Sequence, residues 1–198
     1  MAYAVQAIYI LEIISVLFRI LSRCRMNSIA FFFIADYHSL TTHPNPADFH
    51  KNVRQVLVEY LACGIDPDKC TLFVQSDLPE TAELYLLLNM NAYVGELERC
   101  TSFKDKIRQQ PDNINAGLLT YPTLMAADIL IHRAVKVPVG KDQEQHLEMA
   151  RQFANRFNRI YQTELFPEPF AFNYGINQQT KVQQAAVEQN ILNLIGSA

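Results

Sequence analysis

Residues 137–149 read VPVGKDQEQHLEM, and the junction inside this stretch decides the predicted fold. An apolar run, residues 137–139, stops at Gly140 and passes at once into a helical pattern. Such a step from strand to helix is typical of a parallel sheet, whose ligands bind beyond the carboxyl ends of the strands. Gly140 would let a backbone approach a ligand closely, Asp142 could accept hydrogen bonds from ribose hydroxyl groups, and Gln143 could donate and accept.

Asp142 also has a second interpretation. It could be the N-cap of the following helix, with Gln145 three residues later completing a capping box. The spacing favours neither interpretation, so a ligand-binding role and a capping role both stay open.

The rest of the chain repeats the alternation of strands and helices. Residues 30–35 form a continuous apolar run that ends in Asp36, which predicts a strand buried on both faces. Further strands are predicted at 71–74 and 135–139, and helical patterns lie between and after the strands at 46–61, 80–109, 118–132 and 147–161. This order predicts an α/β fold, a parallel sheet with helices on both faces.

The composition limits the class of protein. The 198 residues are 49% hydrophobic and 19% charged, which is typical of a globular domain and not of a disordered chain. The net charge of −3 gives no strong global attraction to nucleic acid or to an anionic membrane. The four cysteines lack the paired spacing of a zinc site and are too few for a disulfide framework, so they favour a reducing, cytoplasmic setting.

The N-terminal segment has one feature of a membrane protein. Ala2–Phe18 carries a single charge, Glu12, and is followed by Arg19, Arg23 and Arg25. A membrane helix or an uncleaved signal anchor is one interpretation. A buried helix is the favoured one, because a span needs about 20 clean apolar residues and Glu12 lies in the middle of the run.

A second candidate site is TYPTLMAADIL, residues 120–130. On a helix, Tyr121, Met125 and Asp128 share one face, because they are spaced i, i+4 and i+7. Such a stripe usually belongs to the core. A carboxylate within it is less usual, because a buried Asp needs hydrogen-bond donors.

A third candidate is ADYHSLTTHP, residues 35–44, which follows the first predicted strand. Asp36, His38 and His43 could form a metal site, but two histidines at this spacing more often cap turns or contact a ligand. No acidic cluster lies nearby, so no metal ligand is predicted.

Five stretches, taken together, are specific to one family. They are FFFIADYHSLTTHPNP (31–46), EYLACGIDPDKCTLFVQSD (59–77), LNMNAYVGELERCTSFKDK (88–106), NAGLLTYPTLMAADILIH (115–132) and VPVGKDQEQHLEMAR (137–151). In this order they resemble the catalytic domain of bacterial tryptophanyl-tRNA synthetases, which are class I aminoacyl-tRNA synthetases. The sister tyrosyl family would carry Gln where this chain has Met125.

The resemblance implies a Rossmann-like parallel sheet with helices on both faces and a helical insertion at about 80–132. It also implies a reaction in which tryptophan and ATP form tryptophanyl-adenylate and the acyl group passes to tRNA(Trp), usually in a homodimer. Mg²⁺ would carry part of the phosphate charge. A membrane partner is not expected.

The resemblance also implies roles for individual residues. Asp128 would accept from the indole N–H, and its apolar neighbours in the pocket would be Met125, Val137 and Val139. Tyr121 and Gln143 would bind the substrate ammonium group, and His38 would lie near the reacting carboxylate and phosphate. The nucleotide would be bound by Gly140, Lys141 and Asp142, of which Gly140 and Asp142 would contact the ribose.

The two ends of the chain depart from the family pattern. The first nucleotide motif near the N-terminus is absent, although YAVQA, residues 3–7, resembles what normally follows it. The second motif, Lys-Met-Ser-Lys-Ser, does not follow Tyr174. The expected organisation is therefore an atypical apolar helical segment at 1–29, a partial catalytic domain at 30–174 and a polar tail at 175–198.

Three functions are compatible with this organisation. The first is a truncated tryptophan–tRNA ligase homologue that is weak or inactive alone. The second is a non-catalytic module that binds tryptophan or forms a dimer, and the third is a membrane-anchored derivative. The apolar helical stretch at 83–97 has more apolar side chains than one face can bury, which predicts a symmetric homodimer through this region.

Overall fold

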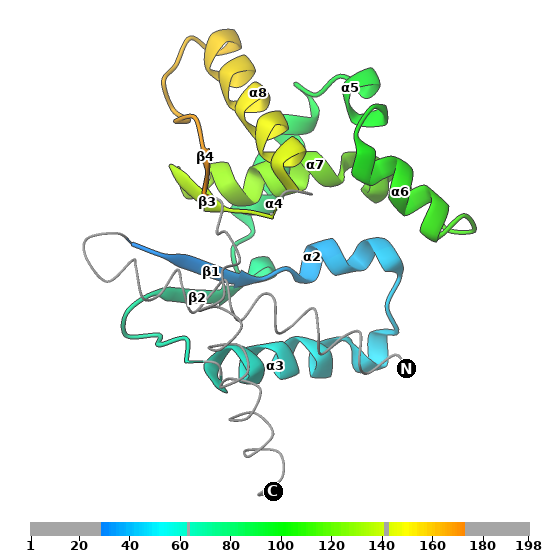
Figure 1. The fold of residues 1–198 in the computed structure, drawn as a ribbon, viewed down its shortest axis with the longest axis vertical. Helices are drawn as coiled ribbons and strands as arrows, with labels where there is room; N and C mark the ends of the chain where they lie inside the picture. Colours follow the sequence, from blue (N-terminus) through cyan, green and yellow to red (C-terminus); the bar gives the residue numbers. More distant parts are fainter. Residues whose placement is uncertain (1–28, 63, 141–142, 173–198) are drawn as a thin grey trace, which may run out of the picture. The chain divides into compact units, whose positions relative to one another are not determined.

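The computed structural model describes residues 29–62, 64–140 and 143–172 (Figure 1). Its strands are β1 (Phe31–Ile34), β2 (Thr71–Val74), β3 (Lys136–Pro138) and β4 (Phe170–Phe172). Its helices are α2 (Asp36–Ser39), α3 (Pro46–Ala62), α4 (Glu80–Asn89), α5 (Val94–Glu98), α6 (Thr101–Gln109), α7 (Ala116–Leu130) and α8 (Glu144–Ile160), with the short 3-10 helices η2 (Leu40–Thr42) and η3 (Gln75–Asp77). Strands and helices alternate along the chain, as the sequence predicts.

The described strands form two pairs. β1 and β2 are neighbours in one two-stranded sheet, and β3 and β4 are neighbours in another. β3 and β4 run parallel, with Val137 opposite Ala171. The sequence does not predict β4, because this strand has three residues and follows Pro167 and Pro169, which usually indicate a loop.

Strand β1 is not buried on both faces, which corrects the prediction from its apolar run. Phe32 and Ile34 are buried, whereas the intervening Phe33 is half-buried and Phe31 is 42% exposed. Successive side chains of a strand point to opposite faces, so burial of alternate residues shows that one face is covered more fully than the other. A run of aromatic residues cannot by itself distinguish these two cases.

The chain forms two compact units. The first unit contains α3 from His50 onward and has a small core in which Phe32 and Ile65 are buried. Partly buried side chains that pack against this pair are Ala30, Tyr60, Cys70 and Leu72. The second unit contains residues 33–49 and the described residues from 73 to 172, and all of the larger core lies in it.

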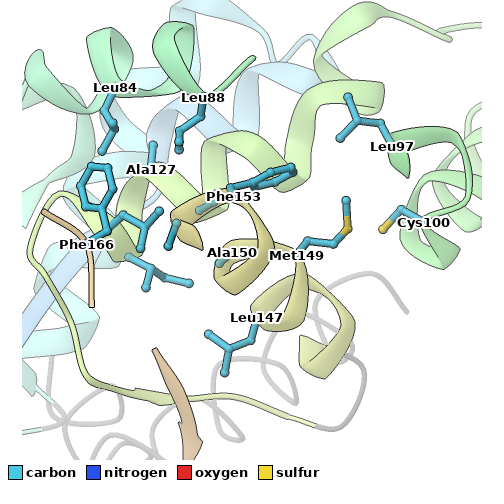
Figure 2. Packing of buried hydrophobic residues seen from close by; sticks show 14 residues of the cluster. Leu84, Leu88, Leu97, Cys100, Ala127, Leu147, Met149, Ala150, Phe153 and Phe166 are labelled. Atoms are coloured by element: carbon cyan, nitrogen blue, oxygen red, sulfur yellow. The ribbon is translucent and has the colours of Figure 1, made fainter. Parts of the chain in front are cut away.

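Helix α7 is the centre of the larger core. It packs against both α4 and α8 (Figure 1). It starts at Asn115, whose side chain accepts from the Leu118 N–H at 3.3 Å, so the N-cap expected of an Asn is present. Figure 2 shows Leu84 and Leu88 of α4 pointing toward Ala127 of α7.

Helix α8 covers α7 with one apolar face. Leu147, Ala150, Phe153 and Ala154 are buried, and their spacing of three and four residues places them on one side of the helix. Phe153 is among the largest fully buried side chains, and Figure 2 shows it in the middle of the cluster. Burial of one such side chain contributes about 1.5–3 kcal/mol, so this face holds α8 in place.

An arginine of α8 connects this helix to the α4–α5 region. Arg156 forms a bidentate ion pair with Glu96, with N–O distances of 2.5 and 3.0 Å, and donates to the Asn91 carbonyl oxygen at 2.7 Å. Its guanidinium also lies 4.2 Å from the centre of the Tyr93 ring. The ion pair lowers the pKa of Glu96, because the hydrogen bonds from Arg156 stabilise the carboxylate.

Candidate functional site

The site is built around a buried carboxylate on α7. Asp128 is 7% exposed, and each of its oxygens has a side-chain partner. Oδ1 accepts from Gln75 Nε2 at 2.6 Å, and Oδ2 is 2.7 Å from His38 Nε2. The structure therefore brings two predicted site residues, His38 and Asp128, into direct contact, and adds Gln75, which the sequence had not indicated.

Gln75 links the carboxylate to the ends of the two strands. It is the first residue after β2, is 1% exposed, and accepts from the Tyr37 backbone N–H at 3.0 Å. Asp36, the second residue after β1, accepts from the same N–H and from the Ser76 N–H, both at 3.0 Å. Asp36 thus joins the segment after β1 to the segment after β2 and is part of the scaffold.

His38 has one ring nitrogen that faces Asp128 and one that does not. Because a carboxylate only accepts, Nε2 carries a hydrogen and donates to Asp128. Nδ1 is buried and has no hydrogen-bond partner among the described residues. Buried polar atoms are usually paired, so this nitrogen is a candidate contact for a ligand.

Tyr121 is a further residue of this site and lies beside His38. The ring centre of Tyr121 is 4.4 Å from that of His38 and 5.9 Å from that of His146. Lys106 Nζ lies 3.9 Å from the centre of the Tyr121 ring. Burial, with a smaller contribution from the nearby charge of Asp128, raises the pKa of Tyr121, so the hydroxyl keeps its proton at neutral pH.

Lys106 brings a positive charge to this group. Its ammonium forms no ion pair within the described residues, and burial lowers its pKa. A partly desolvated cation without a counter-charge favours an anionic ligand. The sequence does not predict this position of Lys106, because nothing in it distinguishes Lys106 from Lys104 two residues earlier. In the structure Lys104 is exposed.

A second group of polar side chains surrounds the start of α8. Gln143 is the N-cap of this helix, and its Oε1 is 2.8 Å from His146 Nδ1. The backbone N–H of Gln143 donates to the Gly140 carbonyl oxygen at 3.0 Å. Lys141 and Asp142, predicted to bind the nucleotide, lie outside the described residues.

Gln145, which could complete a capping box with Asp142, makes a tertiary contact, and Asp142 itself lies outside the described residues. Gln145 Oε1 accepts from the backbone N–H of Thr101 at 3.0 Å and from the Thr101 hydroxyl at 2.6 Å. Gln145 therefore caps helix α6, which is distant in sequence, and leaves its own helix without a side-chain cap. A local pattern could not distinguish this tertiary contact from a capping box.

Three apolar residues predicted to line the pocket lie at the edge of the larger core. Met125, Val137 and Val139 are partly buried and pack against it. Val137 lies in β3, and Val139 is the first residue after this strand. Both valines contact the core, as the predicted apolar wall of a pocket requires.

The third candidate motif does not hold together as a metal site. His43 is exposed and has a φ of 50° where it ends η2, so it forms the end of a turn. Among the described residues, no three His, Cys, Asp or Glu side chains gather to hold a metal ion.

The membrane interpretation concerns the apolar N-terminal segment. Ala2–Phe18 lies outside the described residues. Within the part of the chain that is described, no helix is long and apolar enough to cross a membrane.

Comparison with known proteins gives a consistent result. The family described as tRNA synthetases class I (W and Y) matches residues 14–184. The tryptophan–tRNA ligase of Porphyromonas gingivalis is 73% identical over 145 residues, which are 73% of this chain and 44% of that protein. The chain thus spans less than half the length of this relative.

Solved structures are similar over the same part of the chain. Tryptophanyl-tRNA synthetase from Campylobacter jejuni, complexed with ADP and tryptophan, is 41% identical with a TM-score of 0.71, covering 74% of this chain and 46% of that one. The enzyme from Mycoplasma pneumoniae is 40% identical with a TM-score of 0.68, covering 75% of this chain and 43% of that one. These similarities confirm the predicted family resemblance and the α/β, Rossmann-like fold class.

The contact between Gln75 and Asp128 makes a testable contribution to stability. Gln75→Leu should lower the free energy of unfolding by about 1–3 kcal/mol, because it leaves a buried carboxylate oxygen without its donor. Urea unfolding followed by circular dichroism measures the change. Gln55→Leu, at an exposed position of α3, is the matched control and should change stability by less than about 0.5 kcal/mol. Equal effects of the two substitutions would contradict the assigned role of Gln75.

Proposed function

The chain belongs to the class I tRNA synthetases of the tryptophan and tyrosine family, and on that premise we propose that it is a tryptophan–tRNA ligase homologue. In the proposed reaction, the tryptophan carboxylate attacks the α-phosphorus of ATP, pyrophosphate leaves, and tryptophanyl-adenylate passes its acyl group to tRNA(Trp). The observation that carries the proposal is the buried Asp128 carboxylate beside partly buried apolar side chains. The partial catalytic domain is proposed to extend over residues 30–174, with a helical insertion at about 80–132 and with 1–29 and 175–198 as separate segments.

Asp128 suits the selection of an indole ring. Indole N–H is a donor with no acceptor capacity, so a pocket that selects it needs an acceptor among apolar walls. A carboxylate has about four lone-pair positions, and the two donors on Asp128 occupy two of them. We therefore assign the indole N–H to Asp128, with Met125, Val137 and Val139 as apolar walls.

The remaining contacts follow the polarity of the substrates. The hydroxyl of Tyr121 and the amide oxygen of Gln143 are acceptors suited to the ammonium group. Nδ1 of His38 is assigned to the reacting carboxylate and phosphate, and the charge of Lys106 supports binding of an anion near Tyr121. Gly140 and Asp142 are assigned to the ribose and Lys141 to the phosphates of ATP.

Mg²⁺ is not assigned to side chains of this chain. Among the described residues, no group of three suitable ligands gathers, and the carboxylates of Asp36 and Asp128 already accept hydrogen bonds. Mg²⁺ keeps several waters and commonly binds through substrate phosphates. Nothing in the proposed chemistry of this chain is therefore routed through the metal ion.

The setting of the proposed enzyme follows from its substrates. ATP and tRNA are cytoplasmic, and a reducing compartment agrees with Cys70 and Cys100, which are free thiols among the described residues. A homodimer is supported by an apolar patch that is exposed on α4 and α5 and formed by Leu86, Leu87, Met90, Tyr93 and Val94.

Selectivity for the indole N–H is the direct test of Asp128. Asp128→Asn keeps the shape of the side chain, but its NH₂ group cannot accept. The variant should bind L-tryptophan about 1–3 kcal/mol more weakly, whereas its affinity for L-3-benzothienylalanine, which lacks the N–H, should change little. Isothermal titration calorimetry measures both. Asp105→Asn, at an exposed position of α6, is the control. Equal losses for both ligands would show that Asp128 acts through the fold alone.

The rate of adenylate formation tests the catalytic part of the proposal. A polypeptide of these 198 residues should bind tryptophan but catalyse tryptophan-dependent ATP–pyrophosphate exchange at least about 10⁴-fold more slowly than a complete synthetase. Two phosphate-binding motifs of the family are absent from it, and each is commonly worth about a factor of 100. Exchange at the rate of a complete enzyme would contradict this expectation. Tryptophan binding without any exchange would favour the alternative, a non-catalytic binding module.

The apolar patch predicts the oligomeric state. The wild-type chain should sediment as a dimer at micromolar concentration, and Met90→Glu should shift it toward the monomer, because a charge in the patch would be buried in the interface. Val58→Glu, which changes an exposed apolar residue of α3 outside the patch, should leave the dimer intact. A wild-type monomer at all concentrations would exclude the homodimer.

A further inference from the structure

A continuous row of hydrogen-bonding side chains leads from α6 to the start of α8. Cys100 Sγ is 3.1 Å from Ser102 Oγ, and Ser102 Oγ is 2.6 Å from His146 Nε2. On the other side of the imidazole, Nδ1 is 2.8 Å from Gln143 Oε1. His146 is 2% exposed and Cys100 is fully buried, so the row lies mainly in the interior.

The chemistry of these groups gives the row one direction. An amide oxygen only accepts, so Nδ1 of His146 carries the hydrogen and donates to Gln143. In the neutral ring Nε2 is then an acceptor, and the Ser102 hydroxyl donates to it. The oxygen of Ser102 can in turn accept from the Cys100 thiol. Gln145 Oε1, 3.9 Å from Cys100 Sγ, is a second acceptor for the thiol. The Ser102 hydroxyl is compatible with the Nδ1–H tautomer of His146, which is the tautomer that donates to Gln143.

The thiol at the end of the row is affected by the same contacts. Burial raises the pKa of Cys100, but hydrogen bonding with His146 and Ser102 more than offsets this effect and brings the pKa to about 7. The N-terminal ends of two helices thus contribute to one network, because Cys100 precedes α6, Gln143 precedes α8 and His146 lies in the first turn of α8.

His146 also lies next to the second residue assigned to the ammonium group. The ring centre of His146 is 5.9 Å from that of Tyr121, and the ring centre of His38 is 4.4 Å from that of Tyr121. The imidazole of His146 is therefore near both the Gln143 amide and the Tyr121 ring. Both residues that the proposed function assigns to the substrate ammonium are in contact with it or beside it.

We propose that His146 is a positioning residue, which holds the oxygen of the Gln143 amide, and not its NH₂ group, in place for the ammonium group of a bound amino acid. This inference rests on the proposed tryptophan-binding function. Nδ1–H is attracted to the amide oxygen and repelled by the amide N–H groups, so it favours the orientation that presents the oxygen; the opposite orientation would present N–H donors, which repel an ammonium group. His146 thus determines whether Gln143 presents its acceptor oxygen or its NH₂ donor to the substrate ammonium group.

Two substitutions of His146 test the roles of its two ring nitrogens separately. The amide nitrogen of Asn is bonded to the same carbon position as Nδ1 of His, whereas that of Gln reaches one atom further, as Nε2 does. His146→Asn can therefore keep the donor to Gln143, and His146→Gln can keep only the contact with Ser102. A purely structural role for His146 would not favour Asn over Gln in this way.

Three ligands separate the ammonium contact from the rest of the pocket. L-tryptophan carries both the ammonium and the carboxylate, tryptamine carries only the ammonium, and indole-3-propionate carries only the carboxylate. In His146→Gln, affinity for L-tryptophan and tryptamine should fall roughly tenfold, the value of one hydrogen bond to a charged group, and affinity for indole-3-propionate should change less than about twofold. His146→Asn should retain most of the affinity for all three.

The measurement is calorimetric titration of the full 198-residue chain, with circular dichroism to show that each variant is folded. Ser102→Ala, which replaces a partly exposed residue, gives a second test if the His146 variants do not fold, and should show the same ligand pattern with a smaller loss. His43→Gln, at an exposed turn, is the control and should change none of the three affinities.

The possible outcomes separate this inference from the proposed function. Losses confined to the two ammonium ligands, with rescue by Asn, would support the positioning role. Equal losses for all three ligands would overturn it and leave the tryptophan-binding function intact. A wild-type chain that binds none of the ligands would contradict the proposed function, and the role of His146 with it.

Discussion

A buried carboxylate on α7 is the constraint to which the rest of the site is arranged. Burying a carboxyl group without hydrogen-bond partners costs several kcal/mol, so the Asp128 side chain is stable inside the second unit only where donors converge on it. Gln75 and His38 provide them, from positions 53 and 90 residues away in the sequence. Both donors follow the ends of strands, where polar side chains gather in α/β folds. These two hydrogen bonds therefore join α7 to the short helices α2 and η3, which follow the strands β1 and β2.

The apolar core and the polar site depend on each other through α7 and α8. Packing of α8 on α7 buries Phe153 and places the first turn of α8 near Tyr121. Polar residues of that turn form hydrogen bonds with residues of α6, because Gln145 accepts from the Thr101 N–H and His146 contacts Ser102. A shift of α8 would break these contacts together, because core packing is dense and does not adjust continuously. The orientation of Gln143 is thus set by the core as much as by its immediate neighbours.

The sequence predicts the order of elements well and their tertiary partners poorly. The second strand was predicted with its observed bounds, Thr71–Val74, because a short apolar run between Cys70 and Gln75 permits little else. The need of Asp128 for donors was also predictable, since it follows from burial alone. The identity of those donors was not, because the contact with Gln75 depends on how distant segments pack. The same limit explains Gln145, whose local spacing permits a capping box and whose tertiary contact caps another helix.

The two carboxylates near the strand ends show why residue type alone cannot separate scaffold from site. Asp36 accepts from the backbone N–H groups of Tyr37 in α2 and Ser76 in η3. Asp128 accepts from two side chains, Gln75 and His38. A carboxylate held by backbone donors cannot change partners unless the backbone moves, whereas one held by side chains can change partners through rotation about side-chain bonds. The nature of the donors, and not burial, therefore distinguishes Asp128, to which the proposed function assigns the ligand, from Asp36.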